Sequence, residues 1–390
     1  MKTLNDIDLR DKRVLLRVDF NAPVKNGEVS DDTRLSAHIP TINSILKQRP
    51  RALILISHLG RPKGAPTPEF SLKVVLPNLR KLLGKEVHFF EDCAGNDTKA
   101  GLEKLPAGSI SLLENLRFHS EEKNNDENFA RKLASYGDIF IQDAFAVAHR
   151  AHASTTGIPK FLPSAAGFLI QKEVKYLSEL LKNPERPFVA VLGGAKVSTK
   201  ISVMKSLLSK VDYLLVGGAM SYTFLKARGI NTGLSLVEDD FLEKAKEIDK
   251  ASVGKLLLPV DHLISKSFEA PLENTVTFEI PDGFYGVDIG PQTIGKYEEV
   301  LKNSKTIFWN GPMGIFEVRE FSAGTRRIAE IIAEATKSGA VSVAGGGDSV
   351  AAIKKTGLAA DFSHISTGGG ASLEFVEGRL LPGIEALKQE

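Results

Sequence analysis

Residues 188–201 read FVAVLGGAKVSTKI, an apolar and β-branched run followed by two glycines and a lysine-bearing segment. Such a run is typical of a strand buried on both faces, and the glycines permit a tight turn after it. The second half of the chain repeats this arrangement in 213–221 (YLLVGGAMS), 306–314 (TIFWNGPMG), 341–349 (VSVAGGGDS) and 362–372 (FSHISTGGGAS). Because ligands of an open α/β sheet bind beyond the carboxyl ends of its strands, these loops are the predicted place of function.

The first part of the chain contains similar runs that lead into a different loop chemistry. Basic and imidazole side chains follow the runs in 15–21 (LLRVDFN), 53–62 (LILISHLGRP), 110–118 (ISLLENLRF) and 139–154 (IFIQDAFAVAHRAHAS). Two loop chemistries predict two different ligands, one for each half of the chain.

Amphipathic helical patterns alternate with these predicted strands. They occupy 33–48, 126–137, 238–252 and 321–339, and further strands are expected at 212–217 and 254–265. The order strand, helix, strand predicts an α/β protein with two doubly wound, parallel-sheet (Rossmann-like) domains.

A further helix is predicted within 167–187, where apolar residues form one stripe between a glycine and a proline. The stripe consists of Ile170, Val174, Leu177, Leu180 and Leu181. This helix either joins the two domains or lies on the surface of one of them, and the pattern leaves both open.

The gross composition fits a soluble enzyme. A chain of 390 residues exceeds one comfortable core, so we expect two domains. A net charge of +2 gives no overall attraction to nucleic acid or membrane, and the apolar runs fall short of the ~20 residues that span a bilayer. The N-terminus lacks a signal-peptide pattern, which predicts a cytoplasmic protein. Cys93, the single cysteine, excludes an internal disulfide and is expected to be buried.

The glycine-rich loops of the second half predict a phosphate site. Gly193 and Gly194 let the backbone approach an anion closely. Lys196 and Lys200 are four residues apart, so on a following helix they would share one face. Asp348 lies among glycines, where phosphate would repel it unless a cation stood between them, so the sequence predicts a Mg²⁺-nucleotide. An N-cap role for Asp348 is the alternative, and one residue could serve both purposes.

Two familiar nucleotide motifs are absent from the sequence. Neither G-x-x-x-x-G-K-[ST] nor G-x-G-x-x-G occurs, which argues against a P-loop enzyme, a dinucleotide-binding dehydrogenase and a protein kinase.

The basic loops of the first half predict a site for a small, multiply anionic molecule. The residues are Arg34, Arg61, Arg117 and Arg150 with His58, His149 and His152. The planar fork of arginine matches carboxylate and phosphate oxygens. Asp19 and Asn21 could orient a substrate hydroxyl or hold an arginine. The H-x-x-H pair has no further ligand pattern, which argues against zinc, and no aromatic platform for an oligonucleotide accompanies the basic residues.

These segments together resemble the phosphoglycerate kinase family over essentially the whole length. The matching pieces are RVDFNAPVK, TRLSAHIPTI, SHLGRPKG, LLENLRF, DAFAVAHRAHAST, VLGGAKVSTKI, VGGAM, DIGPQT, WNGPMGIFE, GGGDSVAA and STGGGASLEF, in the family's order. The resemblance implies reversible phosphoryl transfer between 1,3-bisphosphoglycerate and MgADP in glycolysis and gluconeogenesis. It also implies a hinge-bending monomer, with 3-phosphoglycerate on a domain of residues 1–169 and 372–390 and the nucleotide on a domain of 170–371.

The resemblance further implies roles for individual residues. The acid would contact Asp19, Asn21, Arg34, His58, Leu59, Gly60, Arg61, Arg117 and Arg150. The nucleotide would contact Gly194, Lys200, Gly286, Asn310, Glu317, Gly346, Gly347, Asp348 and Ser349, with Glu317 at the ribose and Asp348 as the Mg²⁺ ligand. Arg34, Lys196, Gly369 and Gly370, with Gly368, would stabilise the transferred phosphoryl group.

The chain departs from the family pattern at a few positions. Ala22 stands where valine is common, Gln142 where asparagine is usual, Val147 where threonine is frequent, and Ser349 where threonine is frequent. None of these changes removes a charged or metal-binding group. Two other functions stay open: a kinase or synthetase that acts on another carboxylate through an acyl phosphate, and a non-enzymatic binding module.

Overall fold

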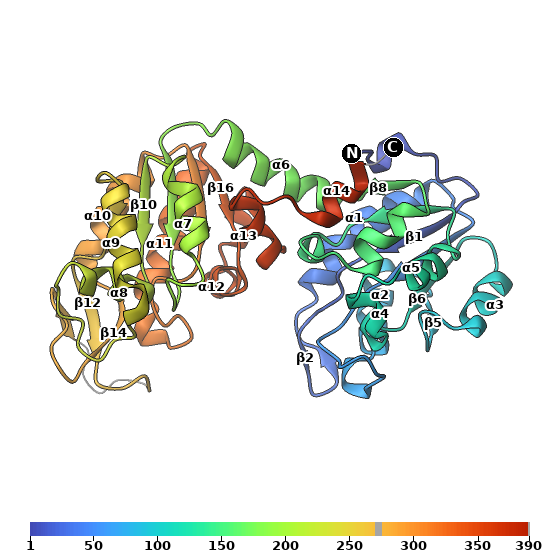
Figure 1. Cartoon of the computed structure of the whole chain (residues 1–390), viewed down its shortest axis with the longest axis horizontal. Helices are drawn as coiled ribbons and strands as arrows, with labels where there is room; N and C mark the ends of the chain where they lie inside the picture. The colour runs from blue at the N-terminus through green and yellow to red at the C-terminus, as the bar shows by residue number, and fades with distance from the viewer. Residues whose placement is uncertain (270–274, 389–390) are drawn as a thin grey trace. The chain divides into compact units, whose positions relative to one another are not determined.

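The computed structural model describes residues 1–269 and 275–388. The chain forms two compact units, the first of residues 1–175 with the segment from Leu380 onward, the second of Tyr176–Arg379 (Figure 1). The division falls within helix α6 (Phe168–Lys182) and after helix α13 (Gly370–Val376), whereas the sequence predicted it at residues 169 and 371. Residues 389 and 390 of the predicted returning segment lie outside the described residues.

The first unit is built on a six-stranded parallel sheet with the order β5-β6-β4-β1-β7-β8. Its strands are β1 (Arg13–Arg17), β4 (Ala52–Ile56), β5 (His88–Phe90), β6 (Ser109–Leu113), β7 (Ile139–Gln142) and β8 (Ser164–Ala166), and β2 (Val24–Lys25) pairs with β3 (Glu28–Val29) in a separate hairpin. The α-helices are α1 (Thr33–Lys47), α2 (Leu76–Leu83), α3 (Asn96–Lys104), α4 (Ser120–Lys123), α5 (Glu127–Ala134) and α14 (Pro382–Glu385).

Both faces of this sheet are buried. Val14 and Leu16 of β1 pack in one core with residues of α1 and α2, whereas Leu15, between them, packs in another core with residues of α5. Successive side chains of a strand point to opposite faces. The unbroken apolar runs of the sequence therefore reflect helices on both sides of the sheet.

The second unit has a six-stranded parallel sheet with the order β11-β10-β9-β15-β16-β17. Its strands are β9 (Phe188–Leu192), β10 (Tyr213–Val216), β11 (Leu256–Leu257), β15 (Thr306–Asn310), β16 (Val341–Ala344) and β17 (His364–Ile365). Its further helices are α7 (Ile201–Leu208), α8 (Met220–Ala227), α9 (Leu242–Ala251), α10 (Pro291–Lys302), α11 (Ala323–Lys337) and α12 (Gly347–Thr356). The predicted class of two doubly wound parallel sheets is confirmed.

The strand order of the second sheet reverses between β9 and β15. The chain first adds β10 and β11 on one side of β9 and then returns to add β15, β16 and β17 on the other. Such a reversal opens a crevice at the carboxyl edge of a doubly wound sheet, where ligands of these folds bind.

The prediction of one strand over 254–265 is wrong. Leu256–Leu257 form β11 of the parallel sheet, whereas β12 (His262–Ser265) pairs antiparallel with β13 (Thr275–Thr277) and β14 (Tyr285–Ile289). Pro259 lies between the two pieces and has no N–H to donate to a sheet, which favours a break there. The small antiparallel sheet was not predicted.

Helix α6 carries the predicted apolar stripe, and Ile170, Leu177 and Leu180 on it are buried. No helix in the described part of the chain has the length and apolarity needed to cross a membrane.

The substitution Leu15→Ala tests the core between the first sheet and α5. We expect it to lower the free energy of unfolding by about 2–5 kcal/mol, because this side chain is fully buried and its loss leaves a cavity. Urea denaturation followed by circular dichroism measures the change. Leu380→Ala, at a residue that is 76% exposed, is the control; equal shifts for both variants would contradict the assignment of this core.

Candidate active site

The carboxyl edge of the first sheet gathers the predicted acid-binding residues. Asp19 and Asn21 follow β1, and residues 58–61 follow β4. Arg117 lies just after β6, and Arg150 lies in the segment after β7. These four strands are neighbours in a parallel sheet, so their loops open at the same edge.

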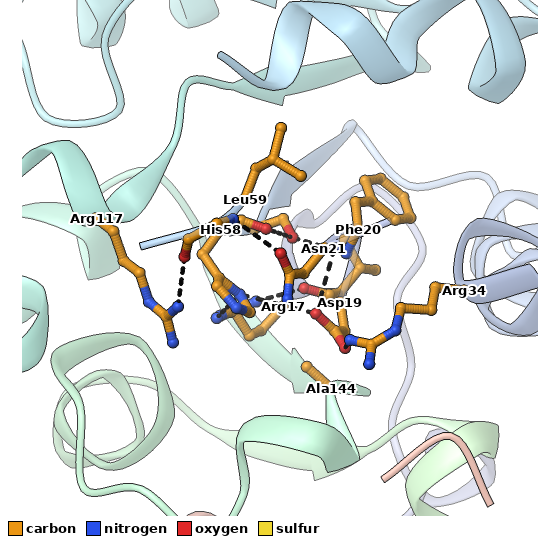
Figure 2. Close-up of polar contacts among 12 residues, drawn as sticks. Arg17, Asp19, Phe20, Asn21, Arg34, His58, Leu59, Arg117 and Ala144 are labelled. Atoms are coloured by element: carbon orange, nitrogen blue, oxygen red, sulfur yellow. Dashed lines mark hydrogen bonds and ion pairs between the residues drawn. The ribbon is translucent and has the colours of Figure 1, made fainter. Parts of the chain in front are cut away.

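Direct contacts fasten these loops to one another (Figure 2). Arg34, in the first turn of α1, donates to Asp19 with Nη1 and Oδ2 2.6 Å apart. The N–H of Gly60 donates to Asn21 Oδ1 at 2.8 Å, and Arg117 Nη1 donates to the Gly60 carbonyl at 2.7 Å. The segments after β1, β4 and β6 thus form one connected surface.

Positive charges surround His58 in this surface. Arg17 Nη2 lies 3.2 Å from His58 Nδ1, and because arginine can only donate, Nδ1 accepts and the neutral ring carries its proton on Nε2. Burial lowers the pKa of His58 well below its usual value, and the charges of Arg17, Arg117 and Arg34 lower it further. Burial, with the charges of Arg17 and Arg150, lowers the pKa of Arg117 to about 10. Arg117 is thus charged and His58 neutral at neutral pH, an arrangement suited to an anion.

Other predicted residues lie at the periphery of this cluster. Arg61 is exposed. Arg150 is also exposed, and its Nε lies 3.2 Å from His149 Nε2. Leu59 is buried, and its carbonyl accepts from Asn115 Nδ2 at 2.7 Å.

Sequence reasoning missed Arg17 and Asn115, which bond to His58 and to the Leu59 carbonyl and so position the loop after β4. Arg17 is fully buried and donates through Nε to Ser154 Oγ at 2.9 Å. A charged residue between the apolar Leu16 and Val18, at the end of β1, is the signal that could have revealed it.

The H-x-x-H pair is engaged with protein groups. His152 is buried, with Nδ1 3.7 Å from Glu122 Oε1. The described residues contain one group whose ligand atoms are close enough to hold a metal ion, made of Asp92, Cys93 and His119. The predicted burial of Cys93 is confirmed, and burial raises the pKa of its thiol well above the usual value, so the thiol stays protonated.

The second unit places Lys200 at the switch point of its sheet. Its Nζ lies 3.2 Å from the carbonyl oxygen of Asn310, the last residue of β15, and also contacts Asn310 Oδ1. Burial lowers the pKa of Lys200 to about 8, and the charge of Asp348 partly opposes this shift.

The prediction that Lys196 and Lys200 share a helix face is wrong. Helix α7 begins at Ile201 with Lys200 as its N-cap, so Lys196 lies in the preceding loop and is exposed. The N–H groups of Lys200 and Ile201 bond to the carbonyl of the buried Val197, which forms a turn ahead of the helix. The loop is therefore longer than predicted and the helix begins later. Lys196 is exposed in this loop, whereas Lys200 is partly buried.

Glycines allow the backbone conformation of the loop between β16 and α12. Gly346 has φ of +96°, and a Cβ on it would collide with the Asn310 amide nitrogen. Gly346 is the N-cap of α12 and Asp348 lies exposed in its first turn, so the alternative of Asp348 as N-cap is wrong. Ser349 Oγ accepts from the Gly311 N–H at 2.5 Å and donates to the Gly345 carbonyl at 2.9 Å, so serine joins this loop to β15.

The other departures from the family pattern are buried. Ala22 and Val147 are 5% and 4% exposed. Gln142 Oε1 accepts from the Ala144 N–H at 3.1 Å.

A cavity of about 280 Å³ lies beside these glycine loops within the second unit. Of the predicted residues it is lined by Gly194, Gly286, Glu317 and Asp348. Its apolar wall, which the sequence did not predict, includes Tyr222, Leu236, Phe268, Tyr285 and Phe316. The antiparallel sheet, which was not predicted, supplies Tyr285, so no local sequence pattern predicted this wall.

The predicted glycines after β17 lie near the same edge. Gly369, with φ of +53°, is the N-cap of α13, which begins at Gly370. Since β17 pairs in parallel with β16, this turn and the Gly346–Gly347 turn follow adjacent strands.

A divalent cation fits the chemistry of this loop. The Asp348 carboxylate is exposed at the cavity, and its charge acts on the buried Lys200 ammonium. Mg²⁺ prefers carboxylate and phosphate oxygens together, and the loop offers one protein carboxylate beside glycine-rich backbone.

Comparisons with known proteins agree with this geometry. Residues 4–379 match the family model described as phosphoglycerate kinase. The chain is 52% identical to phosphoglycerate kinase of Chloroherpeton thalassium over 99% of this chain and 98% of the relative. It is 51% identical to cytosolic phosphoglycerate kinase of Triticum aestivum over 99% and 98% of the two chains.

A solved structure gives the same result. The structure of phosphoglycerate kinase from Coxiella burnetii superposes with a TM-score of 0.89 at 41% identity, over 99% of this chain and 98% of that one. The chain therefore belongs to the phosphoglycerate kinase family.

Proposed function

We propose that this chain catalyses reversible phosphoryl transfer from 1,3-bisphosphoglycerate to MgADP, which gives 3-phosphoglycerate and MgATP. One observation carries the proposal: a buried arginine and histidine cluster lies at one parallel sheet edge, and a glycine-lined cavity with Asp348 lies at another, where the charge of Asp348 also acts on the buried Lys200. The first suits a small polyanionic acid, and the second suits a nucleotide.

The acid binds at the carboxyl edge of the first sheet. The neutral His58 donates through Nε2–H to the non-transferred phosphate, and Arg117 binds it with its charged guanidinium group. The exposed Arg61 and Arg150 bind the same phosphate from the solvent side. The glycerate part contacts Asp19 and Asn21. The backbone of residues 59–60 supports them, because its polar groups already bond to neighbouring loops.

The nucleotide binds in the cavity of the second unit. Its base lies against the apolar wall, Glu317 accepts the ribose hydroxyls, and Lys200 binds the phosphates. The backbone at Gly194 and Gly286 and the segment from Gly346 to Ser349, with Asn310, line the rest of the site. Asp348 would hold Mg²⁺, which neutralises part of the phosphate charge when it is bound.

The transfer step needs electrostatic support more than covalent chemistry. A phosphoryl transition state spreads charge over its equatorial oxygens. Arg34 from the first unit, with Lys196 and the N–H groups at Gly369 and Gly370 from the second, supplies compensating positive groups. The substrate carboxylate attacks the nucleotide phosphate directly in the ATP-consuming direction, so no protein nucleophile is required.

The acid and nucleotide residues belong to different compact units, so we infer that the units close on each other for an in-line transfer. Closure also excludes water, which would hydrolyse the acyl phosphate. We further infer a cytoplasmic monomer; the name of the wheat relative, cytosolic phosphoglycerate kinase, supports the location, and the net charge of +2 supports small-molecule partners over nucleic acid or membrane.

Arg34→Ala tests the transfer step. We expect kcat for MgATP-dependent phosphorylation of 3-phosphoglycerate to fall by about 100-fold to 1,000-fold, as for other preorganised charge-stabilising groups. A coupled spectrophotometric assay measures the rate. Arg51→Ala, at an exposed arginine just before β4 and so at the opposite end of that strand, is the matched control.

Two results of this assay would count against the proposal. Unchanged kcat for Arg34→Ala would remove Arg34 from the transfer path. Turnover of an unphosphorylated carboxylic acid in preference to 3-phosphoglycerate would favour a kinase or synthetase of another specificity.

The depressed pKa of Lys200 predicts a pH dependence of nucleotide binding. In the free protein this pKa is about 8, and bound phosphates favour the charged ammonium and so raise it. Above about pH 8, ADP binding should therefore take up a proton and weaken as pH rises. Calorimetry in buffers of different ionisation enthalpy measures the uptake. Lys200→Arg, which stays charged, should abolish it; equal uptake by this variant would assign the proton to another group.

Closure predicts a change in solution dimensions. We expect the radius of gyration from small-angle X-ray scattering to decrease when 3-phosphoglycerate and a non-hydrolysable MgATP analogue are both present. Either ligand alone should give a smaller decrease, since only the two together complete the transfer site. Identical scattering curves in all four conditions would be evidence against closure.

A further inference from the structure

Helix α1 contacts Asp19 twice, through residues one helical turn apart. Arg34 holds the Asp19 carboxylate at 2.6 Å, and His38 Nε2 lies 2.9 Å from the Asp19 backbone nitrogen. Residues four apart lie on the same face of a helix, so the two side chains reach the same loop. Arg34 is assigned a role in the transfer step, whereas His38 has none.

The contacts of His38 fix its tautomer. A backbone N–H can only donate, so His38 Nε2 accepts from Asp19. In the neutral ring the proton then lies on Nδ1, which donates to Asp143 Oδ2 at 2.8 Å. The second oxygen of Asp143 accepts the N–H of Leu169, in the first turn of α6, at 2.9 Å. The ring is thus held at both nitrogens.

This arrangement is buried. The side chains of His38 and Asp143 are 1% and 0% exposed, so water does not compete for their bonds. The neighbouring N–H groups of Val18 and Phe20 bond to the Ile56 carbonyl and to Ser57 Oγ, at 3.1 and 2.9 Å. The N–H of Asp19, which lies between these two along the chain, donates instead to His38 Nε2 of α1. Without an acceptor there, one point of attachment of this loop is lost and a buried donor is left unsatisfied.

We propose that His38 is a positioning residue for the acid-binding half of the site. It fixes the backbone of Asp19 through Nε2, and the Asp19 carboxylate in turn holds Arg34 and faces the glycerate. This role rests on the proposed function. His38 acts only through Asp19, so its loss affects the use of the acid and leaves nucleotide binding unchanged.

Two substitutions separate this role from a purely structural one. In His38→Gln the amide oxygen can take the place of Nε2 and accept from Asp19, whereas the contact with Asp143 is lost. In His38→Asn the amide nitrogen can take the place of Nδ1 and donate to Asp143, whereas the Asp19 N–H loses its acceptor. Each variant loses one buried hydrogen bond, so both should lower the melting temperature by similar amounts.

The kinetics of the two variants should differ. For His38→Asn we expect kcat/KM for 3-phosphoglycerate to fall roughly ten-fold, the factor that corresponds to one unsatisfied buried donor, with KM for MgATP within about two-fold of the unaltered protein. His38→Gln should keep kcat/KM for 3-phosphoglycerate within about three-fold. Equal losses in both variants, or a matching rise in KM for MgATP, would overturn the positioning role.

The unaltered protein provides a second test that does not depend on the folding of a variant. The ¹⁵N spectrum of histidine-labelled protein, with His38 assigned by its absence in His38→Gln or by residue-specific labelling, should show the proton on Nδ1. A proton on Nε2 would overturn the proposal. Absence of 3-phosphoglycerate turnover by the unaltered protein would overturn the proposed function and this role with it, whereas turnover with equal losses in both variants would overturn only the role of His38.

Discussion

Parallel pairing of strands fixes where most of the candidate site residues of this protein lie. In the first unit β1 pairs in parallel with both β4 and β7, and β4 pairs with β6. Parallel strands all present their carboxyl ends at one edge, so residues far apart in sequence become neighbours there. The helices on both faces are the cost of this arrangement, because parallel sheets require crossover connections. The site therefore depends on the whole packed unit rather than on any one loop.

The cluster of Arg17, Arg117 and His58 in the first unit shows how a protein holds like charges close together. Burial lowers the pKa of Arg17, and the negative charges of Glu122 and Asp19 oppose this effect. His58, in contact with Arg17, stays neutral, so it adds a hydrogen-bond donor without another positive charge. Protein carboxylates thus offset part of the repulsion among the arginines, and the rest is available to favour an incoming polyanion.

Much of the site was predictable because its residues directly follow apolar runs. The strands β1, β4, β15 and β16, which end at or just before Asp19, His58, Asn310 and Asp348, are recognisable from composition alone, and within each unit the parallel topology brings the strand ends to one edge of the sheet. The predictions that were wrong, and the features that were not predicted, depend on local turn geometry or on long-range packing. The turn anchored by Val197 displaced Lys196 from the helix.

The apolar wall of the cavity beside the glycine loops was not predicted, for a different reason. Tyr285 belongs to a short antiparallel strand whose partner β12 lies in a segment that reads as one continuous strand with β11. Pairing of that kind is decided by contacts between distant segments, and no periodicity within either segment records it. Arg17 was missed because a charged residue beside apolar strand residues is ordinarily expected to be exposed, whereas here Ser154 and His58 from other loops accept from it, together with the carbonyl of the adjacent Val18.

The neutral state of His58 determines how the charge of this cluster responds to a fall in pH. A histidine of ordinary pKa gains a proton as the pH falls through about 6.5. Because burial and three arginines hold the pKa of His58 well below its usual value, the ring keeps the same protonation state across mild acidification. The charge of the His58 ring in the free protein therefore does not change over the pH range in which an ordinary histidine titrates.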